Sequence, residues 1–224
     1  MTVVGAAPPA IGSLLREVGW VVVESFMTPS ECDALGSALM TRGWPRVSPE
    51  LAKWIRDPRW GAVTLPYLGP DVRFIREQLL TKAPRSQEEV PWHQDSGYAR
   101  VADEFLTCFL ALDDVSVDNG CLWIVSASHL DGLMPHVPDG YLRTLAVPPN
   151  QPGQPIPLAR GSVVVFSSLA LHRSGENHTG GTRPAWMVQF AGGDVRDVAT
   201  GAPAPGCPLV AHGGQWRSSG VVKA

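Results

Sequence analysis

The strongest indication of the fold comes from a valine-rich stretch and the residues after it, Gly161-Ser162-Val163-Val164-Val165-Phe166 and then Leu171-His172-Arg173-Ser174. Because β-branched residues pack well on a pleated surface, residues 162–166 are predicted to form a buried strand that starts after a glycine. Similar apolar runs predict further strands at 105–112, 121–125 and 185–190. Residues 113–120 are predicted to form the loop between the first two of these strands.

The residues before position 71 show mainly helical signals. A short helix over 9–18 precedes a predicted strand at 20–23, and Thr28, Pro29 and Glu31 have the spacing of a capping box. The helix that follows should run to about Thr41 and stop near Gly43. A shorter helix is expected to open at Ser48-Pro49, whereas residues 71–82 fit either a strand or a helix.

Helices followed by many short strands predict a mainly β protein, an antiparallel double-sheet jelly roll with flanking helices packed outside it. We expect one domain over residues 1–224, with its core at about 14–190. The Pro- and Gly-rich segment 138–157 is expected to be a loop or a mobile lid. The tail, 192–224, is also rich in Gly and Pro, and Trp216 is a candidate for docking it.

Composition restricts the possible partners. The chain has 44% hydrophobic and 17% charged residues and a formal charge of −3, so it is a globular protein with no sign of binding nucleic acid or an anionic membrane. The four cysteines show no metal-ligand spacing and are expected to be reduced. With no signal-like start and no long apolar span, a cytoplasmic location is the default expectation.

The segment Trp92-His93-Gln94-Asp95 carries the main chemical signal. On an extended chain His93 and Asp95 point to the same face, and His172 follows a predicted strand far along the sequence. Two imidazoles and one carboxylate would hold a metal on one side and leave the other side open, which suits non-haem iron(II). Each residue also has an ordinary alternative: a lone His is usually not a ligand, and Asp95-Ser96-Gly97 could be a simple turn.

Arg183 lies eleven residues after His172, at the start of the predicted strand 185–190. An arginine held by a strand beside a metal can bind the distal carboxylate of a dicarboxylate through two parallel hydrogen bonds. The alternative is a surface arginine that happens to precede a proline.

Several motifs, in order, resemble the phytanoyl-CoA dioxygenase family of iron(II)- and 2-oxoglutarate-dependent oxygenases. They cover about residues 14–190 and include Gly19-Trp20-Val21-Val22-Val23, Trp92-His93-Gln94-Asp95, Asn119-Gly120-Cys121-Leu122, Ser126-Ala127-Ser128-His129, and Leu171-His172-Arg173-Ser174-Gly175 with Asn177 and Arg183. An ordered set of this kind is more specific than any one motif.

The resemblance implies a cupin-like double-stranded β-helix with Fe(II) on His93, Asp95 and His172. The co-substrate 2-oxoglutarate would chelate the iron, and Arg183 and Ser174 would hold its far carboxylate, with Lys82 and Thr107 also facing it. O2 would then be used to hydroxylate, desaturate or cyclise a small molecule, as in secondary metabolism, with release of succinate and CO2. Halogenases of this type lack the carboxylate ligand, so the presence of Asp95 argues against a halogenase activity.

The substrate is left open by the sequence. Tyr98, Trp123 and Arg173 are candidate contacts, although packing is the better explanation of Trp123. Ser126-Ala127-Ser128-His129 departs from the family's usual Pro-Gly-Ser-His, and an acyl-CoA substrate is not inherited. Two other classes remain open: a cupin-type metalloenzyme without 2-oxoglutarate, and a jelly-roll binding module without catalysis. Nothing in the sequence indicates the oligomeric state.

Overall fold

The valine-rich stretch forms β10 (Val163–Ser167), a strand inside a large, strongly bent sheet. The structure is a computed structural model that describes residues 2–3, 8–41, 49–101 and 104–218. In this part of the chain the large sheet has eight strands in the order β1-β2-β10-β5-β12-β3-β13-β14. Their bounds are β1 Thr2–Val3, β2 Trp20–Val23, β3 Val72–Lys82, β5 Phe105–Ala111, β12 Arg183–Gly192, β13 Leu209–His212 and β14 Gln215–Trp216. Pairing is antiparallel except between β1 and β2.

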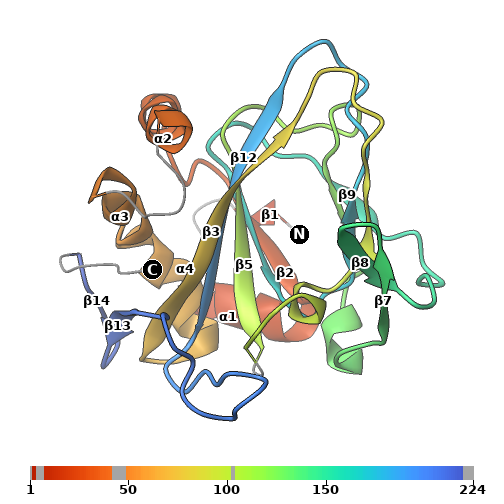
Figure 1. Cartoon of the computed structure of the whole chain (residues 1–224). Coiled ribbons are helices and arrows are strands. Elements are labelled where there is room, and N and C mark those ends of the chain that lie inside the picture. Colours follow the sequence, from red (N-terminus) through yellow and green to blue (C-terminus); the bar gives the residue numbers. More distant parts are fainter. Residues whose placement is uncertain (1, 4–7, 42–48, 102–103, 219–224) are drawn as a thin grey trace.

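A second, smaller sheet faces the large one. Its order is β4-β11-β6-β9, with bounds β4 Val90–His93, β11 His172–Ser174, β6 Leu122–Ile124 and β9 Gln154–Ile156. A separate hairpin, β7 (His136–Asp139) and β8 (Leu142–Leu145), extends beside β4. Figure 1 shows β7, β8 and β9 on the side of the large sheet opposite α2 and α3. The predicted double-sheet fold is therefore confirmed.

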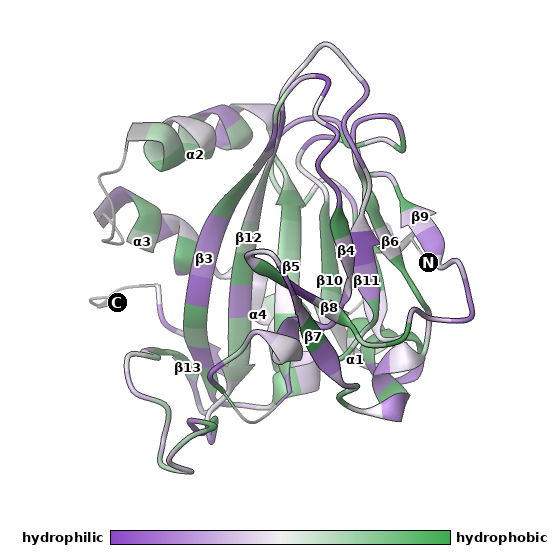
Figure 2. Cartoon of the chain, turned by 45° about the vertical axis from the view of Figure 1, so that its right-hand side comes forward, coloured by the Kyte–Doolittle hydropathy of each residue, from purple (hydrophilic) through white to green (hydrophobic). Residues whose placement is uncertain are grey.

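Both faces of the central strands are covered, which explains why every residue of β5 is buried. Side chains alternate along β10: Val163 and Val165 join the core beneath the helices, whereas Val164 and Phe166 join the core between the two sheets. In Figure 2 the central strands β5 and β10 are pale to green, while β3 carries several hydrophilic bands.

Helices cover the outer face of the large sheet. They are α1 Pro8–Val18, α2 Pro29–Thr41, α3 Pro49–Ile55 and α4 Arg59–Leu68. The capping box is confirmed, because the backbone N–H of Thr28 donates to Glu31 Oε2 at 2.8 Å and that of Glu31 donates to Thr28 Oγ1 at 3.3 Å. The expected stop at Gly43 and start at Ser48 lie outside the described residues. No helix in the described ranges is long and apolar enough to span a bilayer.

Four segments differ from or refine the sequence-based prediction. Residues 72–82 are a strand, and α4 was not predicted because Gly61 and Pro66 interrupt its helical pattern. The segment 138–157, expected to be a loop or lid, instead contributes to the β7–β8 hairpin and to β9. The tail is docked: Trp216 Nε1 donates to the Arg56 carbonyl at 3.0 Å, and its ring packs on Phe190.

Candidate metal centre

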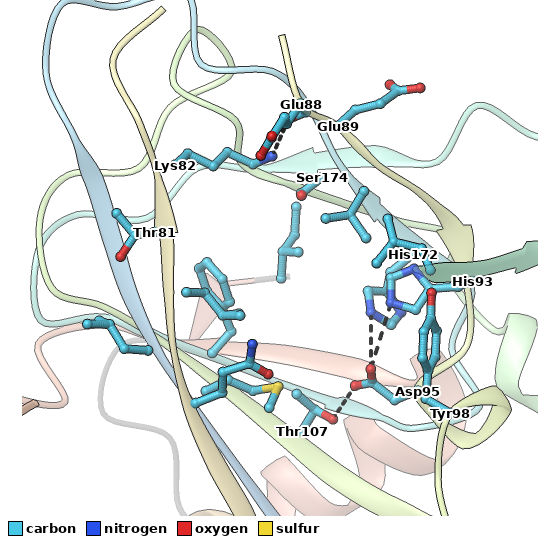
Figure 3. A pocket seen from close by; sticks show the side chains of 18 of the residues that line it. Thr81, Lys82, Glu88, Glu89, His93, Asp95, Tyr98, Thr107, His172 and Ser174 are labelled. Atoms are coloured by element: carbon cyan, nitrogen blue, oxygen red, sulfur yellow. Dashed lines mark hydrogen bonds and ion pairs between the residues drawn. The ribbon is translucent and has the colours of Figure 1, made fainter. Parts of the chain in front are cut away.

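The small sheet places two histidines side by side. His93 ends β4 and His172 begins β11, and the two residues are direct cross-strand partners whose ring centroids lie 4.1 Å apart. Gln94 continues the chain in an extended conformation, and Asp95 then begins a short 3-10 helix, Asp95–Gly97. The predicted trio is thus brought together from two neighbouring strands and one turn (Figure 3).

The ligand atoms of this trio converge. Asp95 Oδ1 lies 3.7 Å from His93 Nε2 and 3.9 Å from His172 Nε2, and one such atom from each of the three buried residues lies within 4.8 Å of the others. His93 Nδ1 is 2.8 Å from the Pro91 carbonyl and His172 Nδ1 is 2.9 Å from that of Ala170. Because a carbonyl only accepts hydrogen bonds, each Nδ1 carries the proton and each Nε2 offers its lone pair.

The protonation states suit a cation. Burial, followed by the nearby His93, lowers the pKa of His172 to about 4, so its ring is neutral at pH 7. Burial alone would raise the pKa of Asp95, but its contacts with His93, His172 and Thr107 outweigh burial and hold it below its usual range. The carboxylate of Asp95 and the neutral ring of His172 therefore face a common point, to which Nε2 of His93 also points.

This trio lines a cavity of about 620 Å³ between the two sheets. Arg183, at the start of β12, also lines it and is only 3% exposed, yet its Nε and Nη1 have no hydrogen-bond partner among the described residues. Burial lowers the pKa of Arg183 to about 10, so it remains charged at pH 7. A buried guanidinium with unpaired donors is costly in isolation and fits a site that receives an anion.

Lys82 and Ser174 complete this end of the cavity. Lys82 is the cross-strand partner of Arg183, and its ammonium donates to the Glu88 carbonyl at 2.8 Å. Ser174 lies two residues after His172 on β11, so both side chains face inward (Figure 3). Gly120 is required here because its φ of +88° is unfavourable for other residues and a Cβ would come within 2.6 Å of the Gly175 carbonyl oxygen.

Of the other predicted site residues, two line the cavity and two lie outside it. Tyr98 lines the cavity and bonds to the Arg143 backbone of the β7–β8 hairpin. Thr107 also lines it, but its hydroxyl donates to Asp95 Oδ2 at 2.5 Å. Arg173 and Trp123 lie outside the cavity, where the Arg173 guanidinium stacks 4.9 Å from the Trp123 ring and 5.6 Å from the Trp92 ring.

Sequence reasoning missed several polar residues at the site. Gln94 is fully buried, and its amide bonds to the backbones of Gly132, Met134 and Leu169, which fixes the turn between His93 and Asp95. Gln189 bonds to Asp95 Oδ2 at 3.2 Å. Its position six residues after Arg183, on the same face of one strand, was the available signal.

Comparison with known proteins identifies the family of the chain. The sequence model of the phytanoyl-CoA dioxygenase family matches residues 38–185, more than half of the chain. The chain belongs to the phytanoyl-CoA dioxygenase family. The resemblance recognised from the sequence motifs is thereby confirmed, and the family match includes the three residues of the metal centre and Arg183.

Relatives in the phytanoyl-CoA dioxygenase family are distant. The human peroxisomal phytanoyl-CoA dioxygenase is 28% identical over 145 residues, covering 59% of this chain and 43% of the relative. The bovine phytanoyl-CoA dioxygenase domain-containing protein 1 is 28% identical over 127 residues, which cover 52% of this chain and 44% of the bovine protein. The chain thus matches less than half the length of each of these relatives.

Solved structures share the fold of this family member. EvdO2 from Micromonospora carbonacea var. aurantiaca superposes with a TM-score of 0.74 at 22% identity, covering 92% of this chain and 98% of EvdO2. The epimerase SnoN, solved with Fe3+, alpha ketoglutarate and nogalamycin RO, has a TM-score of 0.74 at 20% identity, covering 90% and 98%. At these identities the likeness establishes the double-sheet fold.

Proposed function

We propose that this protein is an iron(II)- and 2-oxoglutarate-dependent oxygenase that hydroxylates a small molecule. The observation that carries the proposal is the convergence of His93 Nε2, His172 Nε2 and Asp95 Oδ1 beside a buried arginine with unpaired donors. Family membership supports it, as do the solved relatives EvdO2, crystallised with 2-oxoglutarate, and SnoN, crystallised with Fe3+ and alpha ketoglutarate.

The donor set fits iron(II). Two neutral imidazoles and one carboxylate are the ligands of the facial triad, and both rings are held in the ligating tautomer by backbone carbonyls. When bound, the iron would supply the oxidation of a C–H bond by O2, coupled to conversion of 2-oxoglutarate to succinate and CO2. The protein contributes the arrangement of the reactants.

Arg183 and Ser174 are the residues proposed to hold the far carboxylate of 2-oxoglutarate. A guanidinium offers two parallel N–H donors to a carboxylate, either Nε with Nη2 or Nη1 with Nη2. Each of these pairs on Arg183 includes a nitrogen, Nε or Nη1, that has no partner in the described part of the chain. Phe109 packs against the arginine, with the guanidinium carbon 5.4 Å from the ring centroid.

Cyclisation and desaturation of the substrate are the alternatives to hydroxylation. They differ from it only in how the oxidised substrate carbon reacts.

A small-molecule substrate would enter between the ligands and the β7–β8 hairpin. Tyr98, Tyr141 and Leu142 line this part of the cavity, and Tyr141 is 87% exposed. A cavity of about 620 Å³ is within the usual range for small-molecule sites and is shared with 2-oxoglutarate. We propose these three residues, in place of Trp123 and Arg173, as the substrate contacts.

The proposed activity has a direct test that needs no known substrate. Anaerobic addition of Fe(II) and 2-oxoglutarate to the purified protein should give a weak visible absorption band from metal-to-ligand charge transfer. With O2, a panel of small molecules should then be screened for compounds that stimulate succinate release. Absence of both the band and any 2-oxoglutarate binding would refute the oxygenase assignment and leave a binding module.

Lys82 should give 2-oxoglutarate use a specific pH dependence. Burial and the charge of Arg183 lower the pKa of Lys82 to about 8, against opposing effects of Glu88, Glu89 and Glu176. The ammonium is therefore charged below about pH 8 and neutral above it. We expect kcat/KM for 2-oxoglutarate to fall as pH rises through this value, because a cation is lost from the anion-binding end. In Lys82→Met the fall should disappear; a fall of the same size would exclude Lys82 as its cause.

A further inference from the structure

Three neighbouring strands of the large sheet place a row of polar side chains behind Asp95. Gln189 on β12 is the cross-strand partner of Thr107 on β5 and, on its other side, of Arg76 on β3. Gln189 and Thr107 are each 1% exposed, whereas Arg76 is exposed at the wall of the cavity. The row therefore runs from the solvent-exposed cavity wall to the metal centre.

Hydrogen bonds along this row have a fixed direction. Arg76 Nε donates to Gln189 Oε1 at 2.7 Å. Because arginine has no acceptor, the carbonyl end of the Gln189 amide must face Arg76, and its NH2 end must face inward. Gln189 Nε2 accordingly lies 3.2 Å from Asp95 Oδ2 and 3.0 Å from Thr107 Oγ1.

The two oxygens of Asp95 consequently have different surroundings. Oδ2 accepts hydrogen bonds from both Thr107 and Gln189. Oδ1 faces the Nε2 atoms of His93 and His172. With Oδ2 occupied by these two hydrogen bonds, Asp95 would offer only Oδ1 to a bound metal.

We propose that Gln189 and Arg76 are positioning residues for the metal-binding carboxylate. Arg76 sets the orientation of the Gln189 amide, and Gln189, together with Thr107, holds Asp95 so that Oδ1 alone faces the metal. This inference rests on the proposed function, since it assumes a metal on His93, Asp95 and His172. It assigns a role to two residues that are not among the three converging ligands.

The test is a Co(II) titration of the full chain, followed by visible absorption, with Co(II) standing in for Fe(II). Gln189→Met keeps the length of the side chain and removes its donors. Gln189→Leu also removes the donors, with an uncharged side chain of similar volume. We expect both to weaken Co(II) binding by roughly 10- to 100-fold, as loss of outer partners of metal ligands commonly does, and to alter the Co(II) spectrum. Gln154→Met, an exposed glutamine on β9, is the matched control and should bind as the wild type does.

The Arg76→Met variant is the most discriminating test, because two explanations of Arg76 predict opposite changes in Co(II) affinity. If its positive charge acted directly on a nearby cation, Arg76→Met would strengthen Co(II) binding. As a positioning residue, Arg76 acts through Gln189, so Arg76→Met should weaken binding. For the same reason the double variant Arg76→Met/Gln189→Met should be no weaker than Gln189→Met alone.

Two variants of Thr107 provide an independent test in case the Gln189 variants do not fold. Thr107→Val removes the other donor to Oδ2 and should weaken Co(II) binding, whereas Thr107→Ser retains the hydroxyl and should restore it. Wild-type affinity and spectrum in Gln189→Met, or in Thr107→Val, would overturn the inference, as would tighter binding by Arg76→Met. If the wild-type chain itself bound no Co(II), the proposed function would fail as well, so the two failures are distinguishable.

Discussion

Asp95→Ala should abolish succinate formation and weaken metal binding by more than the roughly 10- to 100-fold typical of losing an outer partner. The substitution removes the only carboxylate of the trio and leaves the two imidazoles. The hydrogen bonds that Asp95 Oδ2 accepts from Thr107 and Gln189 would also be lost. Succinate release and Co(II) titration are the measurements.

His172→Ala should behave in the same way, since it removes one of the two nitrogen ligands. Matched controls separate this effect from general damage. Asp131→Ala and His178→Ala replace residues of the same types that are exposed and lie outside the cavity. Both control variants should form succinate at the wild-type rate. Undiminished turnover in Asp95→Ala would contradict the proposed function.

Arg183→Ala should raise the concentration of 2-oxoglutarate needed for half-maximal activity. Loss of a charge-assisted, two-point contact costs about 1.5 to 3 kcal/mol, which corresponds to roughly 10- to 150-fold in KM. Binding of Co(II) should change little, because Arg183 is not among the ligands. The measurement is succinate release at increasing 2-oxoglutarate concentration.

Two further arginine variants sharpen this prediction. Arg183→Lys keeps the charge but loses the planar pair of donors, so its KM should remain raised. Arg173→Ala removes an arginine that stacks on Trp123 and Trp92 outside the cavity, so the KM for 2-oxoglutarate should stay unchanged. An unchanged KM in Arg183→Ala would exclude this residue as the anchor of the far carboxylate.

The central sheet could be predicted from sequence because its signals are local. Runs such as 162–166 and 185–190 are rich in strand-forming residues and bounded by turn residues, and each forms a strand close to its predicted limits. The helix α4 could not be recognised in this way. Its apolar face is stabilised by tertiary packing, in which Trp60 contacts Phe26, Trp186 and Phe190, and this contact is invisible before the sheet exists.

The site shows the same division between local and tertiary information. His93, Asp95 and His172 were identified because a spacing of two on an extended chain puts both side chains on one face. The same alternation places Arg173, between His172 and Ser174, on the outside. Gln189 and Arg76 depend on which strands pair and in what register, and a single sequence does not contain that information in readable form.

The β7–β8 hairpin is anchored at its base and open at its tip. Thr144 donates to the Trp92 carbonyl at 3.1 Å and Tyr98 accepts from the Arg143 backbone at 2.7 Å, whereas the two-residue turn Gly140–Tyr141 projects into solvent. An insertion or replacement in that turn would reshape the entrance while every strand carrying a ligand kept its register. New substrate ranges could therefore evolve, or be engineered, by editing one turn of this scaffold and leaving its chemistry intact.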